Sequence, residues 1–362
     1  MLKRECTGCM ACYNACPNGS IKMKMDFEGC TYPYINSRTC IQCGKCRAVC
    51  PALQKGDKQQ PEQTIVSYVG YCTDEKIRRT SSSGAVFPLA AKWCIDKGGT
   101  VFGARYDGIR VIHSHAETME AVGLFKGSKY VQSNIGITYR QAREALEKGK
   151  YVLYTGLPCQ IEGLKAYLKK EYERLYTIDL ICHGVGAPGI WEKYIKVFHR
   201  GKKIKHIDFK NKDAGWNKEQ LVIQYANGGE YRRFPLDDYY DYGFNQNIFL
   251  RSSCYDCQYK GFNRKSDLTI GDAWGVEKYA PRFRDDKGCS LVFVHSKRGK
   301  ELFEEISKKM KCEAVDGKKA VQYNQRMISS VPETPKRKEF YENLRKYSFR
   351  LSMMMTKGKK NE

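Results

Sequence analysis

Two runs of cysteine near the start of the chain have the spacing of iron–sulfur ligands. Each run has three cysteines separated by two residues, then a fourth after three more residues and followed by proline. The runs are Cys6, Cys9, Cys12 and Cys16, then Cys40, Cys43, Cys46 and Cys50. Three thiolates so spaced can wrap three corners of a cubane, while the fourth reaches the neighbouring cluster. We predict two 4Fe-4S clusters, with these ligand sets: Cys6, Cys9, Cys12 and Cys50, and Cys40, Cys43, Cys46 and Cys16.

Zinc sites and disulfides are the alternatives to this interpretation. Structural zinc favours pairs of cysteines at variable separation rather than triple runs ending in Cys-Pro. Disulfide frameworks are typical of short secreted domains, whereas this chain has 362 residues and opens without an apolar signal region. The double motif therefore favours clusters. Cys30 lies between the runs and is expected to be a packed thiol.

Four more cysteines lie in positions that suit a ligand site. Cys159 and Cys182 each follow a predicted buried strand, and Cys254-Tyr-Asp-Cys257 is a CxxC pair in a loop. The pair lacks two ligands for a tetrahedral metal environment, and Cys159 with Cys182 would supply them. We predict a third cluster here, with buried apolar thiols as the alternative. His183 is either a proton donor or a buried, hydrogen-bonded histidine. The remaining cysteines are expected to be structural: Cys72, Cys94, Cys289 and Cys312.

A run of hydroxyl side chains precedes a predicted helix. Thr80-Ser-Ser-Ser-Gly84 leads into the apolar pattern of Gly84–Asp96. Free backbone N–H groups at a helix start suit a phosphate. The alternative is that a serine simply caps the helix.

Charge and apolar content restrict the classes of partner. Lysine and arginine number 63 against 40 acidic residues, which gives a formal charge of +23. Two clusters with thiolate ligands would lower that to about +19, so we expect acidic partners, such as a ferredoxin or a dehydrogenase subunit, or an anionic redox substrate. No nucleic-acid reading element is recognisable, so no nucleic acid is expected. No apolar run is long enough to predict a membrane span, and a cytoplasmic location is expected.

The periodicity predicts several segments. Residues 1–56 form the cysteine module and residues 57–63 a polar linker. From 64 to 200 short apolar strands alternate with helices, which is typical of α/β architecture. Residues 201–350 are richer in strands, and 351–362 form a basic tail. The predicted fold is an α+β ferredoxin-like two-cluster module followed by a larger α/β domain with a mixed sheet.

Residues 64–350 resemble a known family. SSSGAVFPLAAKWC, GSKYVQS, VLYTGLPCQIEGL, DLICHGV and SDLTIGDAWG are similar to sequences in the beta subunits of coenzyme F420 hydrogenases and dehydrogenases. The resemblance implies one FAD, an iron–sulfur cluster and electron exchange with F420, a deazaflavin hydride carrier. The family commonly has a Gln-Asp-Gly-Gly type of sequence where this chain has Thr-Ser-Ser-Ser-Gly. That difference weakens the expectation of F420 more than the expectation of a flavin.

The resemblance and the polar helix start together suggest FAD contacts. The phosphates are expected near Thr80, Ser81, Ser82, Ser83 and Gly84, and the ring near Lys129, Tyr130, Gly271, Asp272 and Trp274. Positive charge beside these motifs is expected from Arg78, Arg79, Lys126 and Lys129. No catalytic residue is assigned.

The function expected from these observations is that of an iron–sulfur flavoprotein oxidoreductase. It would transfer electrons between a hydride carrier, F420 or similar, and one-electron carriers through FAD and 4Fe-4S clusters. One alternative is an electron-carrier subunit without a substrate of its own. Another is a ferredoxin-dependent flavin reductase in polysaccharide or cell-surface metabolism.

Overall fold

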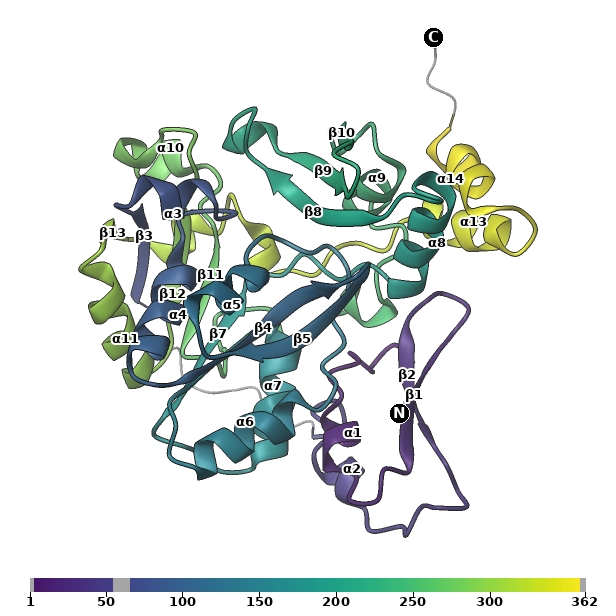
Figure 1. Cartoon of the computed structure of the whole chain (residues 1–362), viewed down its shortest axis with the longest axis horizontal. Coiled ribbons are helices and arrows are strands. Elements are labelled where there is room, and N and C mark those ends of the chain that lie inside the picture. Colours follow the sequence, from purple (N-terminus) through teal and green to yellow (C-terminus); the bar gives the residue numbers. More distant parts are fainter. Residues whose placement is uncertain (1–2, 55–65, 359–362) are drawn as a thin grey trace.

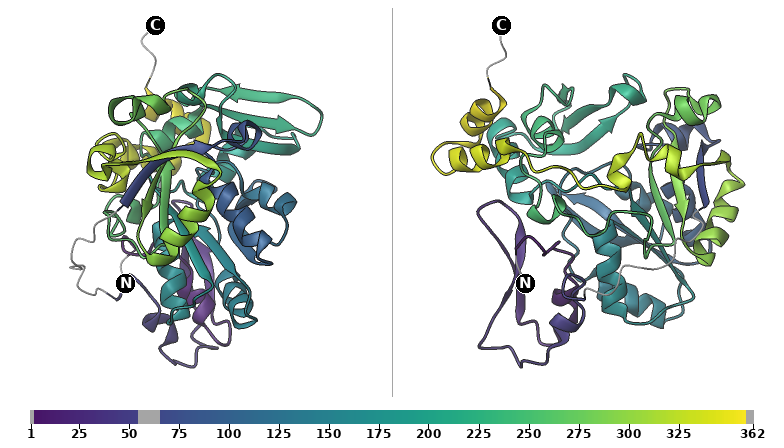
Figure 2. Two further views of the ribbon diagram at one scale, coloured as in Figure 1. Left: turned by 90° about the vertical axis from the view of Figure 1, so that its left-hand side faces the viewer. Right: turned by 180° about the vertical axis from the view of Figure 1, so that it is seen from behind.

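The computed structural model describes residues 3–54 and 66–358 (Figure 1). The predicted linker at 57–63 and the last four residues of the predicted tail lie outside the described residues. The cysteine module lies at the bottom of the molecule beside α6 (Thr138–Glu147) and α7 (Pro158–Leu168), and a three-stranded sheet lies at the top (Figures 1 and 2). No helix within the described ranges is long and apolar enough to cross a membrane.

The two cysteine runs adopt the same backbone path. Gly8 and Gln42, each just before the second cysteine of its run, have positive φ angles of 69° and 52°. Met10 and Gly44, each just after that cysteine, have φ angles of 61° and 70°. Alternating left-handed residues turn the chain tightly, as a loop around a compact ligand requires. The repeat seen in the sequence is therefore also a repeat in conformation.

Each cysteine run contains a short helix, and one strand follows the first run while another precedes the second. The elements of the module are α1 (Ala11–Ala15), β1 (Ile21–Met25), β2 (Thr31–Ile35) and α2 (Lys45–Ala48). The strands form an antiparallel hairpin in which Ile21 lies opposite Ile35. This arrangement agrees with the predicted ferredoxin-like module.

The larger domain is built on one mixed sheet with the strand order β13-β3-β12-β11-β7-β6-β4-β5. Neighbours among β4, β6, β7 and β11 are parallel, and the other pairs are antiparallel. The strands are β3 (Val66–Cys72), β4 (Thr100–Asp107), β5 (Arg110–Ala116), β6 (Val152–Gly156), β7 (Leu175–Leu180), β11 (Leu268–Asp272), β12 (Ser290–Val294) and β13 (Met310–Val315). Both predicted halves, 64–200 and 201–350, contribute strands to it.

Helices cover both faces of this sheet because successive side chains of its strands point in opposite directions. Leu153 faces a core with α4 (Val86–Asp96) and α11 (Lys297–Ser307). Its neighbour Tyr154 faces the core of α6 and α7. The other helices and turns are α3 (Glu75–Arg79), α5 (Met119–Val122), η1 (Gly123–Phe125), α10 (Val276–Tyr279), η4 (Pro281–Phe283), α12 (Gly317–Ala320) and η5 (Gln325–Met327).

A second, antiparallel sheet packs with helices around an aromatic core that includes Trp191, Tyr194, Tyr240 and Phe340. Its elements are α8 (Pro188–Phe198), β8 (Ile204–Asn211), η2 (Trp216–Lys218), β9 (Gln220–Tyr225), β10 (Glu230–Arg233), α9 (Tyr239–Asn245), η3 (Ser252–Cys254), α13 (Pro335–Leu344) and α14 (Phe349–Lys357). Residues 351–357 were expected to start a basic tail, but they form most of α14. Met353 on this helix is fully buried, so apolar packing outweighs the basic composition there.

Candidate flavin and cluster sites

A cavity of about 480 Å³ lies at the edge of the main sheet where its parallel strands end. Open α/β sheets bind ligands at this edge, and the volume is ordinary for a small-molecule site. Eight of the ten residues expected to contact FAD line it: Ser81, Ser82, Ser83, Lys129, Tyr130, Gly271, Asp272 and Trp274. Thr80 and Gly84 are outside the lining.

The serine run does not cap the helix that follows it. Helix α4 has Ala85 as its N-cap, with φ of 70° and no capping hydrogen bond from a side chain. Ser81 Oγ donates to Ile77 O at 2.8 Å, and Ser83 Oγ donates to Cys289 O at 2.6 Å. The capping alternative is therefore wrong, and the first turn of α4 keeps N–H groups for another acceptor.

Gly84 has a packing role. Its N–H donates to Ser290 Oγ at 2.9 Å, and a Cβ atom there would lie 2.3 Å from Gly70 O. Only glycine allows the segment just before α4 to approach the sheet so closely. Thr80 is exposed, and its hydroxyl accepts from Lys126 Nζ at 3.3 Å.

Lys129 lies in the cavity wall with its side-chain nitrogen fixed by main-chain carbonyls. Its ammonium donates to the carbonyls of Phe125, Lys126 and Gly127 at 3.1, 2.8 and 2.9 Å. Burial lowers the pKa of Lys129 to about 7, and the nearby carboxylate of Asp208 opposes that shift. Tyr130 beside it stacks on Phe244 with ring centroids 4.4 Å apart.

Opposite charges meet on another part of the wall. Lys210 Nζ lies 2.6 Å from Asp272 and 3.0 Å from Glu219. Burial disfavours the charge of Lys210, but the two carboxylates raise its pKa overall. The ammonium also lies 4.7 Å from the ring of Trp274, which stacks on Trp216. Sequence reasoning missed Lys210 and Glu219, which belong to no recognisable motif.

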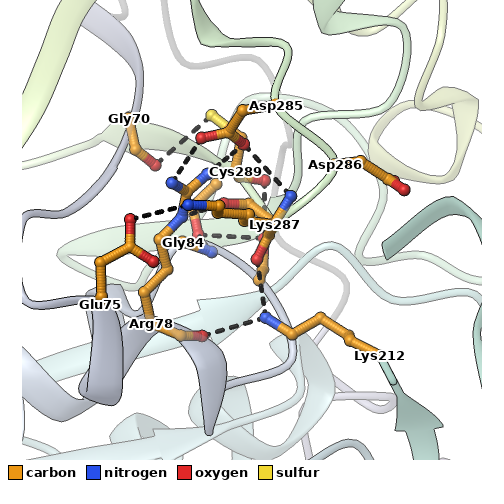
Figure 3. Close-up of polar contacts among 12 residues, drawn as sticks. Gly70, Glu75, Arg78, Gly84, Lys212, Asp285, Asp286, Lys287 and Cys289 are labelled. Carbon is orange, nitrogen blue, oxygen red and sulfur yellow. Dashed lines mark hydrogen bonds and ion pairs between the residues drawn. The ribbon is translucent and has the colours of Figure 1, made fainter. Parts of the chain in front are cut away.

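Arg78 was expected to supply positive charge beside the flavin motifs, but it points elsewhere (Figure 3). It is 1% exposed, and its guanidinium donates to both carboxylate oxygens of Asp285 at 2.7 and 2.6 Å. It also donates to Gly288 O at 2.8 Å. Its charge is thus neutralised inside the protein. Of the four expected cations, Lys126 and Lys129 line the cavity, whereas Arg78 and Arg79 do not.

The other contacts in Figure 3 join distant segments. Lys212 Nζ donates to Arg78 O at 3.0 Å and to Lys287 O at 2.9 Å. Lys287 Nζ contacts Glu75 at 3.1 Å. These bonds hold the start of the serine run against the 285–289 loop.

A smaller cavity brings together the four later cysteines. Cys159 begins α7, Cys182 follows β7, and Cys254 and Cys257 lie in and after η3; all four line this cavity. Burial and the three neighbouring sulfurs raise the pKa of Cys159. Burial, with Cys182 nearby, raises the pKa of Cys254 to about 12.

Four cysteine ligands can hold either one zinc ion or one cubane cluster. Within the described part of the chain, no three Cys, His, Asp or Glu side chains are grouped tightly enough to hold a single metal ion. In a cubane each thiolate binds a different iron, so its four ligands stand further apart. Four cysteines around one cavity supply the number of thiolates that a 4Fe-4S cluster takes.

His183 lies on the walls of both cavities. Its Nε2 lies 2.7 Å from Asn247 Oδ1. Burial lowers the pKa of His183 to about 4. His183 is half-buried and hydrogen-bonded, which is closer to the second of the two alternatives, and it is neutral near pH 7.

In the N-terminal module, Cys50 lies near Cys6, Cys9 and Cys12 of its predicted ligand set, and it also lies near Cys46 of the other set. Burial, with Cys6 and Cys50 nearby, raises the pKa of Cys9 to about 11. In the other predicted set Cys43 is exposed, and Cys16 Sγ donates to Asn18 Oδ1 at 3.4 Å.

The remaining cysteines are packed thiols. Cys30 is 1% exposed and belongs to the aromatic core. Cys72, Cys94 and Cys289 are buried, and Cys312 is half-buried.

The second cavity adjoins both the first cavity and the first cysteine set. The two cavities share Leu157 and the segment 182–185 in their walls. Gly163 lies one turn after Cys159 on α7, and a Cβ there would lie 3.0 Å from Cys9 Sγ. Cys9 therefore packs directly on the helix that carries Cys159.

Comparison with protein families identifies known domains in both parts of the chain. Residues 149–320 match the model for the C terminus of the "Coenzyme F420 hydrogenase/dehydrogenase, beta subunit". This region belongs to that family. Residues 5–53 and 32–76 match two models of 4Fe-4S dicluster domains. The chain thus joins a 4Fe-4S dicluster domain to a domain of an oxidoreductase family, as expected from the motifs.

Two curated relatives belong to methanogens. The beta subunit of the F420-dependent formate dehydrogenase of Methanocaldococcus jannaschii is 24% identical over 247 residues, 65% of this chain and 58% of the relative. The chain thus spans less than two thirds of that protein. The F subunit of the F(420)H(2) dehydrogenase of Methanosarcina mazei is 22% identical over 330 residues, 84% of this chain and 83% of the relative.

A solved structure is also similar. A chain of the F420-reducing NiFe hydrogenase complex from Methanosarcina barkeri aligns with 73% of this chain and 90% of its own length. The identity is 18% and the TM-score 0.46.

Proposed function

We propose that this protein is an iron–sulfur flavoprotein that exchanges electrons between a hydride carrier and one-electron carriers. The supporting observation is the row of sites: a ligand-sized cavity, then four cysteines, then the first cysteine set of the dicluster module. A flavin supplies the chemistry that links a two-electron hydride donor to one-electron clusters. The protein's own task is to hold these groups in order.

The large cavity suits FAD. The uncapped first turn of α4 and the nearby Lys126 can hold the phosphates. Tyr130 and Trp274 offer aromatic surface for a flat ring. Three main-chain carbonyls fix the side-chain nitrogen of Lys129 in the cavity wall.

A third 4Fe-4S cluster would be held by Cys159, Cys182, Cys254 and Cys257. As thiolates, Cys159, Cys182 and Cys254 would carry negative charge that burial disfavours, which is why burial raises the pKa of these three thiols. Bound iron removes that penalty. The cavity shares Cys182 and His183 with the flavin cavity, so a cluster there would adjoin the flavin.

The hydride partner is proposed to be coenzyme F420 or another flat anionic redox molecule. The names of both curated relatives specify F420. With Arg78 paired to Asp285, the cations of the cavity wall are Lys126, Lys129, Arg326 and Lys210, and Lys210 is itself paired with Asp272 and Glu219. This is less than the sequence suggested, and an anionic substrate would also share the wall with Asp272 and Glu219.

The first test is cofactor content after anaerobic purification of the whole chain. We expect about twelve irons, as three cubanes require, and one FAD released on denaturation. Cys257→Ser should keep about eight irons, as two cubanes require. Cys312→Ser, which changes a half-buried thiol outside the cavity, should keep all of them. A protein without flavin, unable to bind added FAD, would instead support the alternative of an electron carrier without its own substrate.

The second test identifies the hydride partner. Reduced F420, NADH, NADPH and reduced ferredoxin are mixed separately with the oxidised protein, and flavin absorbance is followed. Rapid bleaching by reduced F420 alone supports the proposal. Faster bleaching by NADH contradicts F420 while leaving the flavin and clusters in place. Bleaching by ferredoxin alone favours a ferredoxin-dependent reductase.

A further inference from the structure

Arg251 is a buried arginine that contacts a cysteine of the first N-terminal set. It is 1% exposed. Its Nε donates to Cys6 O at 2.7 Å, and its Nη2 lies 3.6 Å from Cys6 Sγ. Further bonds run from Nη2 to Thr31 O at 3.0 Å and from Nη1 to Gln132 Oε1 at 2.9 Å. The guanidinium is therefore fixed in orientation with one donor directed at a predicted ligand sulfur.

The same residue also adjoins the four-cysteine cavity. Arg251 lines that cavity, its N–H donates to Val185 O at 3.0 Å, and its carbonyl accepts from Cys254 N at 2.9 Å. Gly8, in the first cysteine run, packs so closely on the guanidinium that a Cβ there would lie 2.8 Å from Nη1. Arg251 thus lies between two cysteine sets, in the region through which electrons would pass.

Among the described residues, no carboxylate forms an ion pair with Arg251. Its described acceptors are main-chain carbonyls, an amide oxygen and the Cys6 sulfur, with the ring of Tyr32 at 4.3 Å. A buried charge without a counter-ion is costly. Arg337, at the same interface of module and larger domain, provides a contrast because it pairs with Glu28. A cluster with thiolate ligands, which carries negative charge, would supply the missing counter-charge for Arg251.

We propose that Arg251 is a positioning residue that raises the reduction potential of the cluster held by Cys6, Cys9, Cys12 and Cys50. Reduction adds one electron to a cluster that is already negative. A fixed positive charge and an N–H···S hydrogen bond stabilise that reduced form. This inference depends on the proposed function only for the presence of the cluster, and it does not require the flavin.

The test is a potentiometric titration of the whole chain, followed by electron paramagnetic resonance, in the wild type, R251Q, R251K and R337Q. In R251Q the midpoint should fall by about 30 mV or more. That equals about a threefold change in the equilibrium constant, since a one-electron tenfold change is 59 mV. R251K keeps a charge but loses the fork of donors, so its midpoint should fall by less. The second N-terminal cluster serves as an internal reference.

Each result decides the question. An unchanged potential in R251Q with full iron, or an equal shift in R337Q, overturns the proposal. If R251Q loses its iron, R251K decides, because an unchanged midpoint there contradicts a role for the directed N–H···S bond. If the wild type itself yields no iron or signal, the cluster assignment fails rather than the role of Arg251.

Discussion

His199 shows how much a single buried side chain can contribute to pH dependence. It is 2% exposed, and its two ring nitrogens lie 2.8 and 3.1 Å from the hydroxyls of Tyr225 and Tyr194. Burial, with Lys202 nearby, lowers the pKa of His199 to about 4. An unfolded chain takes up that proton near pH 6.5. The contribution to stability is therefore full above pH 6.5 and is lost as the pH falls toward 4.

We predict that His199→Gln weakens the loss of stability on acidification. One histidine of this kind contributes up to about 1.4 kcal/mol per pH unit. Between pH 6.5 and 5 the free energy of unfolding should thus fall less in the variant, by about 1–2 kcal/mol. Urea unfolding at several pH values, followed by fluorescence, measures the free energy of unfolding at each pH. His206→Gln, at an exposed position of β8, is the control. Parallel pH profiles for wild type and H199Q would contradict the prediction.

At the scale of elements, helix α7 of the larger domain packs against the cysteine module. Its N-terminal turn carries Cys159, and one turn later Gly163 contacts Cys9 and the hydroxyl of Tyr139. Glycine inside a helix ordinarily costs about 1 kcal/mol relative to alanine. Here the missing side chain leaves space for Cys9 of the module. Glycine has a low helix propensity, but at this position it allows the helix and the module to pack closely.

Alanine usually stabilises a helix relative to glycine. Gly163→Ala is instead expected to be unfavourable, because it disturbs the packing of Cys9. The new Cβ would lie 2.8 Å from Cys9 Cβ and 3.0 Å from its sulfur. Cys9 must move, so we expect loss of about four irons, the content of one cubane. Iron analysis and the visible spectrum measure this. Gly123→Ala, where a Cβ meets nothing within 4 Å, should keep all the iron. Full iron in G163A would show that Cys9 can adapt.

At the scale of the whole molecule, the second cysteine run lies on the surface. Cys43 is exposed, Ile41 is 65% exposed, and Lys45 and Arg47 beside them are exposed. Residues 29–54 contain no acidic side chain. An apolar centre surrounded by basic side chains suits transient binding of an acidic electron carrier. Long-range attraction between the opposite charges raises the rate of encounter.

The double variant K45E/R47E should slow electron exchange with an acidic ferredoxin by about tenfold or more at low salt. The difference should shrink as salt is added, because exposed charges are screened. Stopped-flow mixing at several ionic strengths measures both effects. The control is K300E/K308E, the same charge change at exposed positions on and just after α11. Equal rates in the two double variants would place the docking site elsewhere.

The sequence by itself determined the features that depend on local spacing. Three cysteines two residues apart can adopt few conformations around a cubane, and both runs indeed share their left-handed residues. Strand-end placement likewise brought Cys159 and Cys182 together, because β6 and β7 are parallel neighbours. For the same reason most residues of the expected flavin site line one cavity.

Only the tertiary structure decided the pairings between distant segments. Arg78 looked like a free cation until the fold placed Asp285 against it, more than two hundred residues away. Arg251 and Lys210 belong to no motif, yet they contact Cys6 and Asp272. Such contacts depend on strand order and domain packing. Local periodicity cannot encode them, because a charged side chain has the same sequence pattern whether solvent or a buried partner neutralises it.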